Sequence, residues 1–449
     1  MRAAIGDDGL PLQGWRRTFS SLSGNRDFTF LFAGNIGFFF GMQMMMILSG
    51  WLVIRRWDNA AYLGYVLATA AVPMLVLAPI GGVVGDRVEK RRLLLITQSL
   101  LVVTSGTVSA LILTDAIEFW HLLVITPVSA AAFSFNIPGR QALVAILVPR
   151  DRLMNAISLS TAAMNAARIV APATAGILIA PIGIGGAYVV ATACYASAAV
   201  ATAFLPVAKV QRTREFTFVE DFTGGFGYIR RTPLVLGLLF LATVPMIFAM
   251  PYQTLLPVFA DKVWHVGPMG FGVMQASAGI GGFAGGLVAA NLDEFRRKGM
   301  LMLGAAVVFG VLLFALAVSP WFGVALALMA GMGFASMTFT TVNSAAIQMV
   351  IPHEVRGRVM SVMMMTFGLM PLGAVPAGIA AQSIGAPPVV AVGAVLFVIS
   401  TLGTFALAPS LRGMDRAMEE GAEDSAGAEI VGPVRAVTGG SVGSMQPPR

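Results

Sequence analysis

The sequence predicts an all-α membrane protein with twelve transmembrane helices in two pseudo-symmetric six-helix bundles. Three observations predict this fold class. The 449 residues are 57% hydrophobic and only 11% charged, whereas soluble domains have roughly a quarter charged residues. Apolar runs near twenty residues, each long enough to span a bilayer as a helix, recur along most of the chain. Short landmarks of the first half also return about 205 residues later.

Short polar segments separate the apolar runs and set the limits of the expected helices. Transmembrane strands would give segments of about ten residues that alternate in polarity, and the sequence contains no such pattern. The expected spans are residues 28–53, 62–85, 93–113, 119–141, 154–180, 184–206, 233–258, 268–290, 300–318, 321–347, 359–382 and 386–408.

These spans divide the chain into five parts. Residues 1–26 form a polar N-terminal tail, and the apolar run that follows is too long for a signal-peptide core. Residues 27–206 form the first six-helix bundle, 207–232 a polar cytoplasmic linker, and 233–411 the second bundle. Residues 412–449 are rich in Glu, Ala, Gly, Ser and Pro, a composition that predicts a disordered cytoplasmic tail.

The distribution of basic residues predicts that both termini are cytoplasmic. The expected outer loops contain only Arg55, Arg56 and Lys262 as basic residues, and cytoplasmic loops retain positive charge. Tryptophan anchors helices at the headgroup level, and five of the six tryptophans fall at or near expected outer ends. We therefore expect a multi-pass protein in contact with membrane lipid.

Short landmarks repeat at a nearly constant offset. The cluster Lys90–Arg92 returns as Arg296–Lys298, an offset of 206 residues. The segment Val148–Asp151 returns as Ile351–Glu354, an offset of 203 residues. A constant offset predicts two halves with the same topology, related by an axis along the membrane normal.

The stretch Gly81–Arg92 is densely charged and lies between two apolar runs. Charges at this density cannot lie in hydrocarbon, so the stretch predicts a tight hydrophilic turn. It resembles the loop between helices 2 and 3 of the major facilitator superfamily of transporters, although Glu89 stands where many members carry glycine. The residues that match the family pattern are Gly82, Asp86, Arg87, Lys90 and Arg91.

The resemblance implies a gate at this loop. In the family, the aspartate at the position of Asp86 faces the N-terminus of helix 11, whose unpaired N–H groups carry partial positive charge. In this sequence that helix is expected to start near Arg358. The contact would close the cytoplasmic side and favour the outward-facing state. The alternative is that Asp86 only balances the positive charge of an ordinary cytoplasmic loop.

Further motifs are similar to the enterobactin-exporter type in the drug- and siderophore-exporting branch of this superfamily. They include Pro138–Leu143, Asn165–Pro172, Met250–Ala260 and Arg356–Ser361. The resemblance covers most of residues 25–411. It implies a secondary active exporter that works by alternating access in a bacterial-type plasma membrane.

Helices 1, 4, 7 and 10 line the central cavity in this superfamily. The polar residues that the resemblance places there are Asn35, Gln43, Asn136, Tyr252, Gln253, Thr338 and Asn343. Arg168 is interpreted as the one basic residue deep in a span, about 21 Å past Met154 at 1.5 Å per residue. An intramembrane charge is a functional hypothesis by default. The alternative is an arginine whose bonds to adjacent helices hold the half-bundle together.

No Asp or Glu lies in the middle of an expected span, although a proton-coupled exporter usually needs a carboxylate in its cavity. Proton antiport is therefore what the resemblance implies and not what the residues show. Asp27, at the inner mouth of the first span, is the candidate proton carrier.

The sequence gives no reason to expect a metal, a cofactor or enzyme activity. The three histidines are scattered and the single cysteine, Cys194, lies in an apolar run, so no metal-ligand spacing occurs. The basic clusters between spans are a topology signal and do not indicate nucleic-acid binding. We expect a monomer that exports a small amphipathic molecule. The alternatives are a transporter of the same fold for a lipid or an imported metabolite, and a sensor that binds its ligand without transport.

Overall fold

The computed structural model describes residues 21–22, 25–149, 152–207, 227, 229–291, 297–351, 359–360, 362–363 and 365–415, without the side chains of 78–87, 290, 367 and 412. Within these residues every regular element is a helix and no strand occurs. The all-α class predicted from the apolar runs is confirmed.

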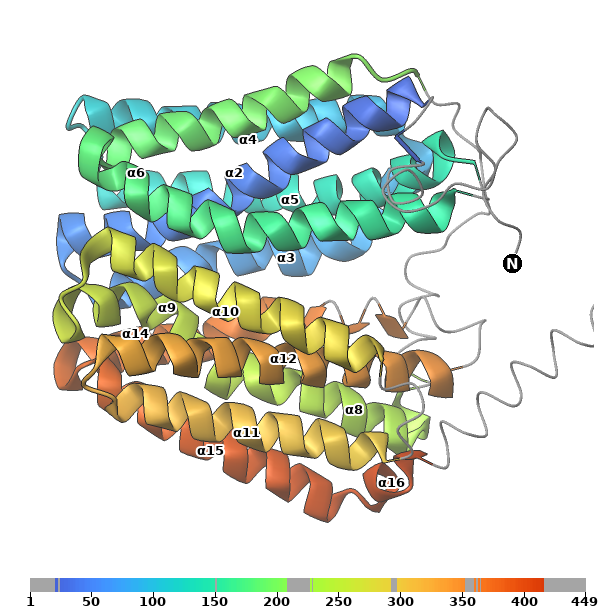
Figure 1. Cartoon of the computed structure of the whole chain (residues 1–449), viewed down its shortest axis with the longest axis vertical. Helices are drawn as coiled ribbons and strands as arrows, with labels where there is room; N and C mark the ends of the chain where they lie inside the picture. The colour runs from blue at the N-terminus through green and yellow to red at the C-terminus, as the bar shows by residue number, and fades with distance from the viewer. Residues whose placement is uncertain are drawn as a thin grey trace, which may run out of the picture.

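The described part of the first half contains five helical elements. They are α2 (Arg26–Trp57), α3 (Ala60–Arg87), α4 (Lys90–Leu113), α5 (Phe119–Leu147) and α6 (Leu153–Ala203). α6 is interrupted at Gly183, where φ is 71° and ψ is 174°. Glycine adopts such a conformation without a Cβ clash, and the chain reverses there at the left-hand end of Figure 1. α6 therefore contains two of the expected spans.

The second half begins with a run of four short helical elements. They are α8 (Pro233–Val244), η1 (Pro245–Ala249), α9 (Pro251–Val258) and η2 (Phe259–Val263), and η1 and η2 are π-helical. Pro245 opens η1, because a proline cannot donate the hydrogen bond that continues an α-helix. The elements that follow are α10 (Gly267–Ala290), α11 (Lys298–Val318), α12 (Phe322–Val350), η3 (Thr366–Leu369), α14 (Met370–Ile384), α15 (Ala386–Leu407) and α16 (Pro409–Arg412).

The described residues are compatible with twelve spans. Ten stretches are long and apolar enough to cross a membrane, with α6 counted as one stretch of 51 residues. Its two parts on either side of Gly183 make an eleventh span. The region of η3 and α14 falls where a twelfth is expected, but its α-helical part has only 15 residues. Several helices also extend beyond the expected limits, and α5 reaches Leu147 where the prediction ended at 141.

Figure 1 shows the helices in two groups, with α2 to α6 above and α8 to α16 below. In the upper group, α2 and α4 pack against α6; in the lower group, α12 packs against α10 and α11. Between the groups, α3 contacts α14 and α6 contacts α10. Apolar side chains such as Val103 and Val311 are exposed, as expected for helices that face lipid.

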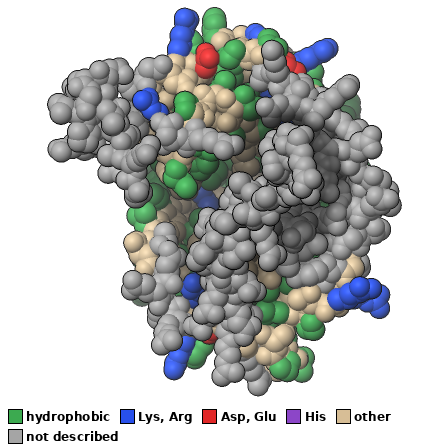
Figure 2. Space-filling model, turned by 90° about the vertical axis from the view of Figure 1, so that its right-hand side faces the viewer, with side chains coloured by type: hydrophobic (Ala, Val, Ile, Leu, Met, Phe, Trp, Pro, Cys, Tyr) green, Lys and Arg blue, Asp and Glu red, His purple; other side chains and the backbone are tan. Residues whose placement is uncertain are grey.

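We call the end at which α2 ends and α3 begins the outer end, following the predicted topology; it is on the left in Figure 1. Figure 2 faces the opposite, inner end, where described Lys and Arg side chains lie around the rim. Most of the two tails and of the linker 207–232 falls outside the described residues. The division into five parts therefore stays a prediction.

Candidate functional site

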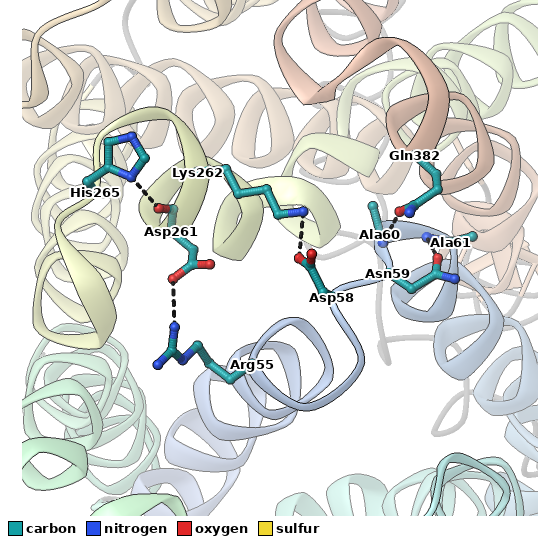
Figure 3. A network of polar contacts seen from close by, with 9 residues as sticks. All are labelled: Arg55, Asp58, Asn59, Ala60, Ala61, Asp261, Lys262, His265 and Gln382. Atoms are coloured by element: carbon teal, nitrogen blue, oxygen red, sulfur yellow. Dashed lines mark hydrogen bonds and ion pairs between the residues drawn. The ribbon is translucent and has the colours of Figure 1, made fainter.

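Two ion pairs join the two halves at the outer end (Figure 3). Arg55 Nη1, in the last turn of α2, lies 3.6 Å from Asp261 Oδ1 in η2. Lys262 Nζ, also in η2, lies 2.5 Å from Asp58 Oδ1. We call these four residues the outer clasp. Exposed ion pairs contribute only about 0.2–1 kcal/mol each, so the clasp is a contact that can break and re-form.

The end of α2 places Asp58 in the clasp. The residue has φ 49° and ψ 34°, a left-handed conformation, and its N–H donates to the carbonyl of Ile54. Aspartate visits this conformation more readily than most side chains. The helix therefore stops at Trp57, and the carboxylate of Asp58 is presented toward Lys262 (Figure 3).

A hydrogen bond from α3 to α14 provides a third link at the outer end. The N–H of Ala60 donates to Gln382 Oε1 at 2.9 Å. Ala60 is the first residue of α3, and the first N–H groups of a helix have no partner within it. Next to this bond the two backbones touch. A Cβ at Gly64 would lie 2.8 Å from Val375 Cα, and one at Gly378 would lie 2.8 Å from the Ala60 carbonyl oxygen.

Helices α6 and α10 are in similarly close contact. A Cβ at Gly176 would lie 2.5 Å from the Pro268 carbonyl oxygen, and one at Gly272 would overlap that of Pro172. These positions belong to the outer parts of both helices. The outer end is thus closed by backbone packing between the halves as well as by ion pairs.

Arg168 lies farther inward on α6, at the boundary between the halves. Its carbonyl oxygen would be 3.1 Å from a Cβ at Gly279 of α10, and its side chain is exposed. An exposed guanidinium at this depth needs water or a polar ligand around it.

Tyr252 and Gln253 lie on α9 in the second half. Tyr252 is 6% exposed, and its ring meets that of Phe309 edge-on with centroids 6.2 Å apart. Gln253 is half-buried and donates from Nε2 to the Met250 sulfur at 3.5 Å. This bond is weak, because a thioether is a poor acceptor.

A buried cluster of polar residues crosses the first half. Arg140 of α5 is 3% exposed. It donates from Nε to Asn136 Oδ1 at 2.8 Å and from Nη1 to Asn35 Oδ1 of α2. Asn136 donates in turn to Thr97 Oγ1 of α4 at 2.8 Å. With the neighbouring Gln98, these residues form what we call the polar layer. The structure thus brings together two of the expected cavity residues, Asn35 and Asn136, through an arginine.

The interpretation of Arg168 as the one basic residue deep in a span is wrong, because Arg140 is buried as well. The expected fourth span ended at residue 141, which put Arg140 at the membrane edge. In the structure α5 continues to Leu147, about 10 Å farther at 1.5 Å per residue. One signal could have found it: Arg140 follows Asn136 by four residues, so both lie on one helix face.

In the second half, Asn343 occupies the position that corresponds to Arg140. α5 and α12 both have 29 residues, and their bounds differ by the same offset (322 − 119 = 350 − 147 = 203). Arg140 and Asn343 differ by 203 as well. Asn343 is 1% exposed, and its Oδ1 has no hydrogen-bond partner among the described residues.

Thr338 lies at a pocket of the second half, apart from the polar layer. Its hydroxyl donates to the Phe334 carbonyl at 2.9 Å. The residue lines a pocket of about 460 Å³ between α11 and α12, whose lining also includes Arg297. No residue of the first half lines this pocket, so Thr338 borders a space within the second half.

The two remaining expected residues lie on α2. Gln43 is half-buried in its middle. Asp27 is in the first turn, where a carboxylate faces the unpaired N–H groups of the helix. It lies about 12 Å from Asn35 along the helix axis at 1.5 Å per residue. Asp27 is therefore at the inner mouth, away from the polar layer.

Part of the expected gate falls outside the described residues. The backbone of α3 continues to Arg87, but the side chains of Gly82–Arg87 and the region near Arg358 are not described. The gate contact of Asp86 stays a prediction. Lys90 begins α4, and Arg91 Nη2 donates to the Ala203 carbonyl at 2.6 Å.

Glu89 has a structural reason to stand where the family often has glycine. Its carboxylate accepts hydrogen bonds from the N–H groups of Arg91 and Arg92, each at 3.1 Å. Glu89 is thus the N-cap of α4. A side-chain cap of this kind satisfies N–H groups that the helix leaves free.

Comparison with known proteins identifies the family. Residues 17–431 match the family MFS_3, described as transmembrane secretion effector. The chain belongs to this family. The MFS_3 match spans both groups of helices in Figure 1, and it confirms the predicted resemblance to major facilitator transporters. The chain is a multi-pass membrane protein of a transporter family.

Three relatives named for drugs or siderophores agree with the predicted branch. The staphyloferrin A transporter of Staphylococcus aureus (strain NCTC 8325 / PS 47) is 24% identical over 362 residues, which cover 79% of this chain and 90% of that protein. Macrolide efflux protein A of Streptococcus pyogenes is 21% identical over 71% of this chain and 80% of that protein. The enterobactin exporter EntS of Shigella boydii serotype 4 (strain Sb227) is 26% identical over 58% of this chain and 59% of its own length.

A solved structure supports the fold. The crystal structure of the nucleoside transporter NupG is similar with a TM-score of 0.67 and 14% sequence identity, covering 87% of this chain and 99% of that one. At this identity the likeness concerns the fold alone, and it confirms the major facilitator architecture.

Proposed function

We propose that this chain is a secondary active transporter that exports a small amphipathic molecule by alternating access between its two halves. The observation that carries the proposal is the outer clasp together with the close packing of α6 on α10. Weak exposed ion pairs and glycine-mediated contacts hold the outer end closed. Such contacts break at low energetic cost, which a transporter that opens to either side needs.

Polar side chains among apolar ones support a small amphipathic cargo. Arg168 offers an exposed cation, and the amide of Gln253 is half-buried. The neighbouring Tyr252 packs its ring against Phe309. The relatives named as a macrolide efflux protein and an enterobactin exporter favour export as the direction and a bacterial inner membrane as the location.

We propose the following roles for the remaining features. Asp86, with Gly82, Arg87, Lys90 and Arg91, closes the inner side in the outward-facing state. Asp27 carries the proton if transport is driven by antiport. Both termini are cytoplasmic, the linker 207–232 joins the two bundles on the same side, and the transporter works as a monomer.

The experiment compares cells that lack the protein with cells that express it. Mass spectrometry of cells and medium should show at least one small molecule that moves from cells to medium on expression. Enrichment inside the cells would assign import of a metabolite instead. A solute that binds the purified protein but crosses no reconstituted membrane would assign a sensor.

A variant whose outer clasp can be cross-linked tests whether export requires the outer end to open. Asp58→Cys with Lys262→Cys, in a Cys194→Ser background, places two thiols across the outer clasp. A short bifunctional thiol reagent that is cleaved by reductant should stop export, and reductant should restore it. Each single-cysteine variant should be unaffected by the reagent.

A further inference from the structure

We propose that the first half contains a binding site for one anionic group, a carboxylate or a halide ion, formed by Arg140, Gln98 and Tyr195. This site is separate from the outer clasp and from Arg168. If the anion is a carboxylate of the cargo, the inference rests on the proposed function. If the anion is a free ion, the inference does not depend on the proposed function.

Four buried polar atoms at this place have no hydrogen-bond partner among the described residues. They are Arg140 Nη2, Gln98 Nε2, Gln98 Oε1 and Tyr195 Oη. The side chains are nearly inaccessible, with exposed fractions of 3% for Arg140, 0% for Gln98 and 1% for Tyr195. Buried polar groups are normally paired, so each exception needs an explanation. Three of the four atoms are hydrogen-bond donors or can act as donors.

Arg140 and Tyr195 meet at Phe38 of α2. The Arg140 guanidinium lies 4.1 Å from the centroid of the Phe38 ring, and the rings of Phe38 and Tyr195 are 6.0 Å apart. Donors from α5 and α6 therefore approach the same ring.

Gln98 faces the same interior. It lies one helical turn before Leu101, which packs in one cluster with Phe38 and Tyr195. It lies one turn after Leu94, which packs with Phe28 and Leu31 of α2. Residues three and four apart share a helix face, so Gln98 sits between these two apolar clusters, at the level of Asn35.

No carboxylate of the described residues balances Arg140 in this layer. Asn35 and Asn136 accept two of its hydrogen bonds but are neutral, and Phe38 contributes only the weaker attraction of its ring face. An arginine stays protonated in proteins, and an unpaired buried charge is unfavourable. An anion between the guanidinium, the amide and the phenol would supply the missing charge and accept the free donors.

A purely structural role explains only part of this arrangement. If Arg140 only linked α2 to α5, it would need the hydrogen bonds of its Nε and Nη1 atoms, and the structure shows both. This structural role does not explain Arg140 Nη2, the amide of Gln98 or the hydroxyl of Tyr195. Because these atoms are inaccessible in this conformation, the anion would enter when the helices of the first half move apart.

The test measures the thermal stability of the purified full-length protein in lipid nanodiscs. Sodium chloride or sodium acetate replaces sodium gluconate at constant ionic strength. The expected result is a saturating rise in Tm of about 1–3 °C with at least one small anion, because a ligand of the native state stabilises it. Gln98→Leu and Tyr195→Phe should abolish the rise. Arg92→Gln, which removes an exposed cation outside the site, should keep it.

The outcomes separate the sources of the anion. A rise with chloride alone assigns a free halide, and a rise with acetate alone assigns a carboxylate. In the second case the cargo acid should be exported at least tenfold faster than its methyl ester. A missing rise with both anions would overturn the site, as would an undiminished rise in both Gln98→Leu and Tyr195→Phe. The Tm readout does not require transport, so its result is independent of the proposed function.

Discussion

The carbonyl oxygen of Arg168, on α6 of the first half, would lie 3.1 Å from a Cβ at Gly279, on α10 of the second. The side chain of Arg168 is exposed at this boundary. Within the described residues, no hydrogen bond or ion pair engages that side chain. Removal of its guanidinium should therefore affect function more than folding.

Arg168→Gln should lower export roughly ten- to hundredfold, because a hydrogen bond to a charged group contributes about 1.5–3 kcal/mol. The Tm should stay within about 1 °C of wild type, since the side chain has no structural partner. Vesicle efflux and thermal unfolding measure the two effects. Arg168→Lys retains the charge and should keep part of the activity. Full export by Arg168→Gln, or loss of its fold, would point to the structural role.

Lys262→Gln should shift the transporter toward outer-open conformations. One exposed pair contributes about 0.2–1 kcal/mol, so the open population should rise about 1.5- to 5-fold. Gln253→Cys in a Cys194→Ser background reports opening through its reaction with an impermeant thiol reagent added from outside. Arg56→Gln is the matched control, because Arg56 pairs with Asp115 of the same half at 2.9 Å.

A charge exchange sharpens this prediction. Asp58→Lys combined with Lys262→Asp should restore the wild-type rate of labelling, whereas each single reversal should accelerate it. Equal labelling in all of these variants would remove the clasp from the gating mechanism.

Gly272→Ala should prevent the outer end from closing fully. The added methyl group would overlap the Pro172 carbonyl oxygen, and a backbone atom cannot move aside as a flexible side chain can. Overpacking of this kind costs about 1–3 kcal/mol. Export should fall at least tenfold and outer labelling of Gln253→Cys should rise. Gly304→Ala is the control, because no atom lies within 4 Å of a Cβ at that position.

Thiol labelling in intact cells tests the orientation. Thr114→Cys, at the exposed end of α4, should react with an impermeant reagent from outside. Asn291→Cys, at the exposed end of α10, should react only after the cells are permeabilised. The reverse pattern would invert the predicted topology.

Asp27→Asn should uncouple export from an imposed pH gradient in proteoliposomes. The reason is that Asp27 is a half-buried carboxylate at the inner mouth, and no described carboxylate lies deeper in a span. The rate ratio with and without the gradient should fall to about one in the variant. Strong coupling that survives the substitution would identify a different proton carrier, and wild-type export that ignores the gradient would exclude antiport.

The helical fold could be predicted because a chain in hydrocarbon can adopt few backbone structures. Backbone groups in a bilayer must be paired within a helix or a closed barrel, so long apolar runs at a constant repeat already define helices in two halves. Helix ends were less certain. Polar residues near the ends, such as Arg140, continue the helix beyond the hydrocarbon limit that hydropathy estimates.

The site was only partly predictable from the sequence. The sequence identifies Asn35 and Asn136 as polar residues in spans, but hydropathy places their shared partner Arg140 at a membrane edge. From the sequence alone, Arg55 and Lys262 are only topology signals. Their partnership with Asp261 and Asp58 depends on how helices from the two halves pack, and local sequence patterns contain no information about contacts across 200 residues of chain.

The equivalence of Arg140 and Asn343 has an electrostatic consequence. Two helices of equal length bury a charged residue in one half and a neutral amide in the other. The two halves are therefore alike in their helices and unlike in the electrostatic potential of their interiors. Whatever approaches from one half meets a cation, and whatever approaches from the other meets a dipole.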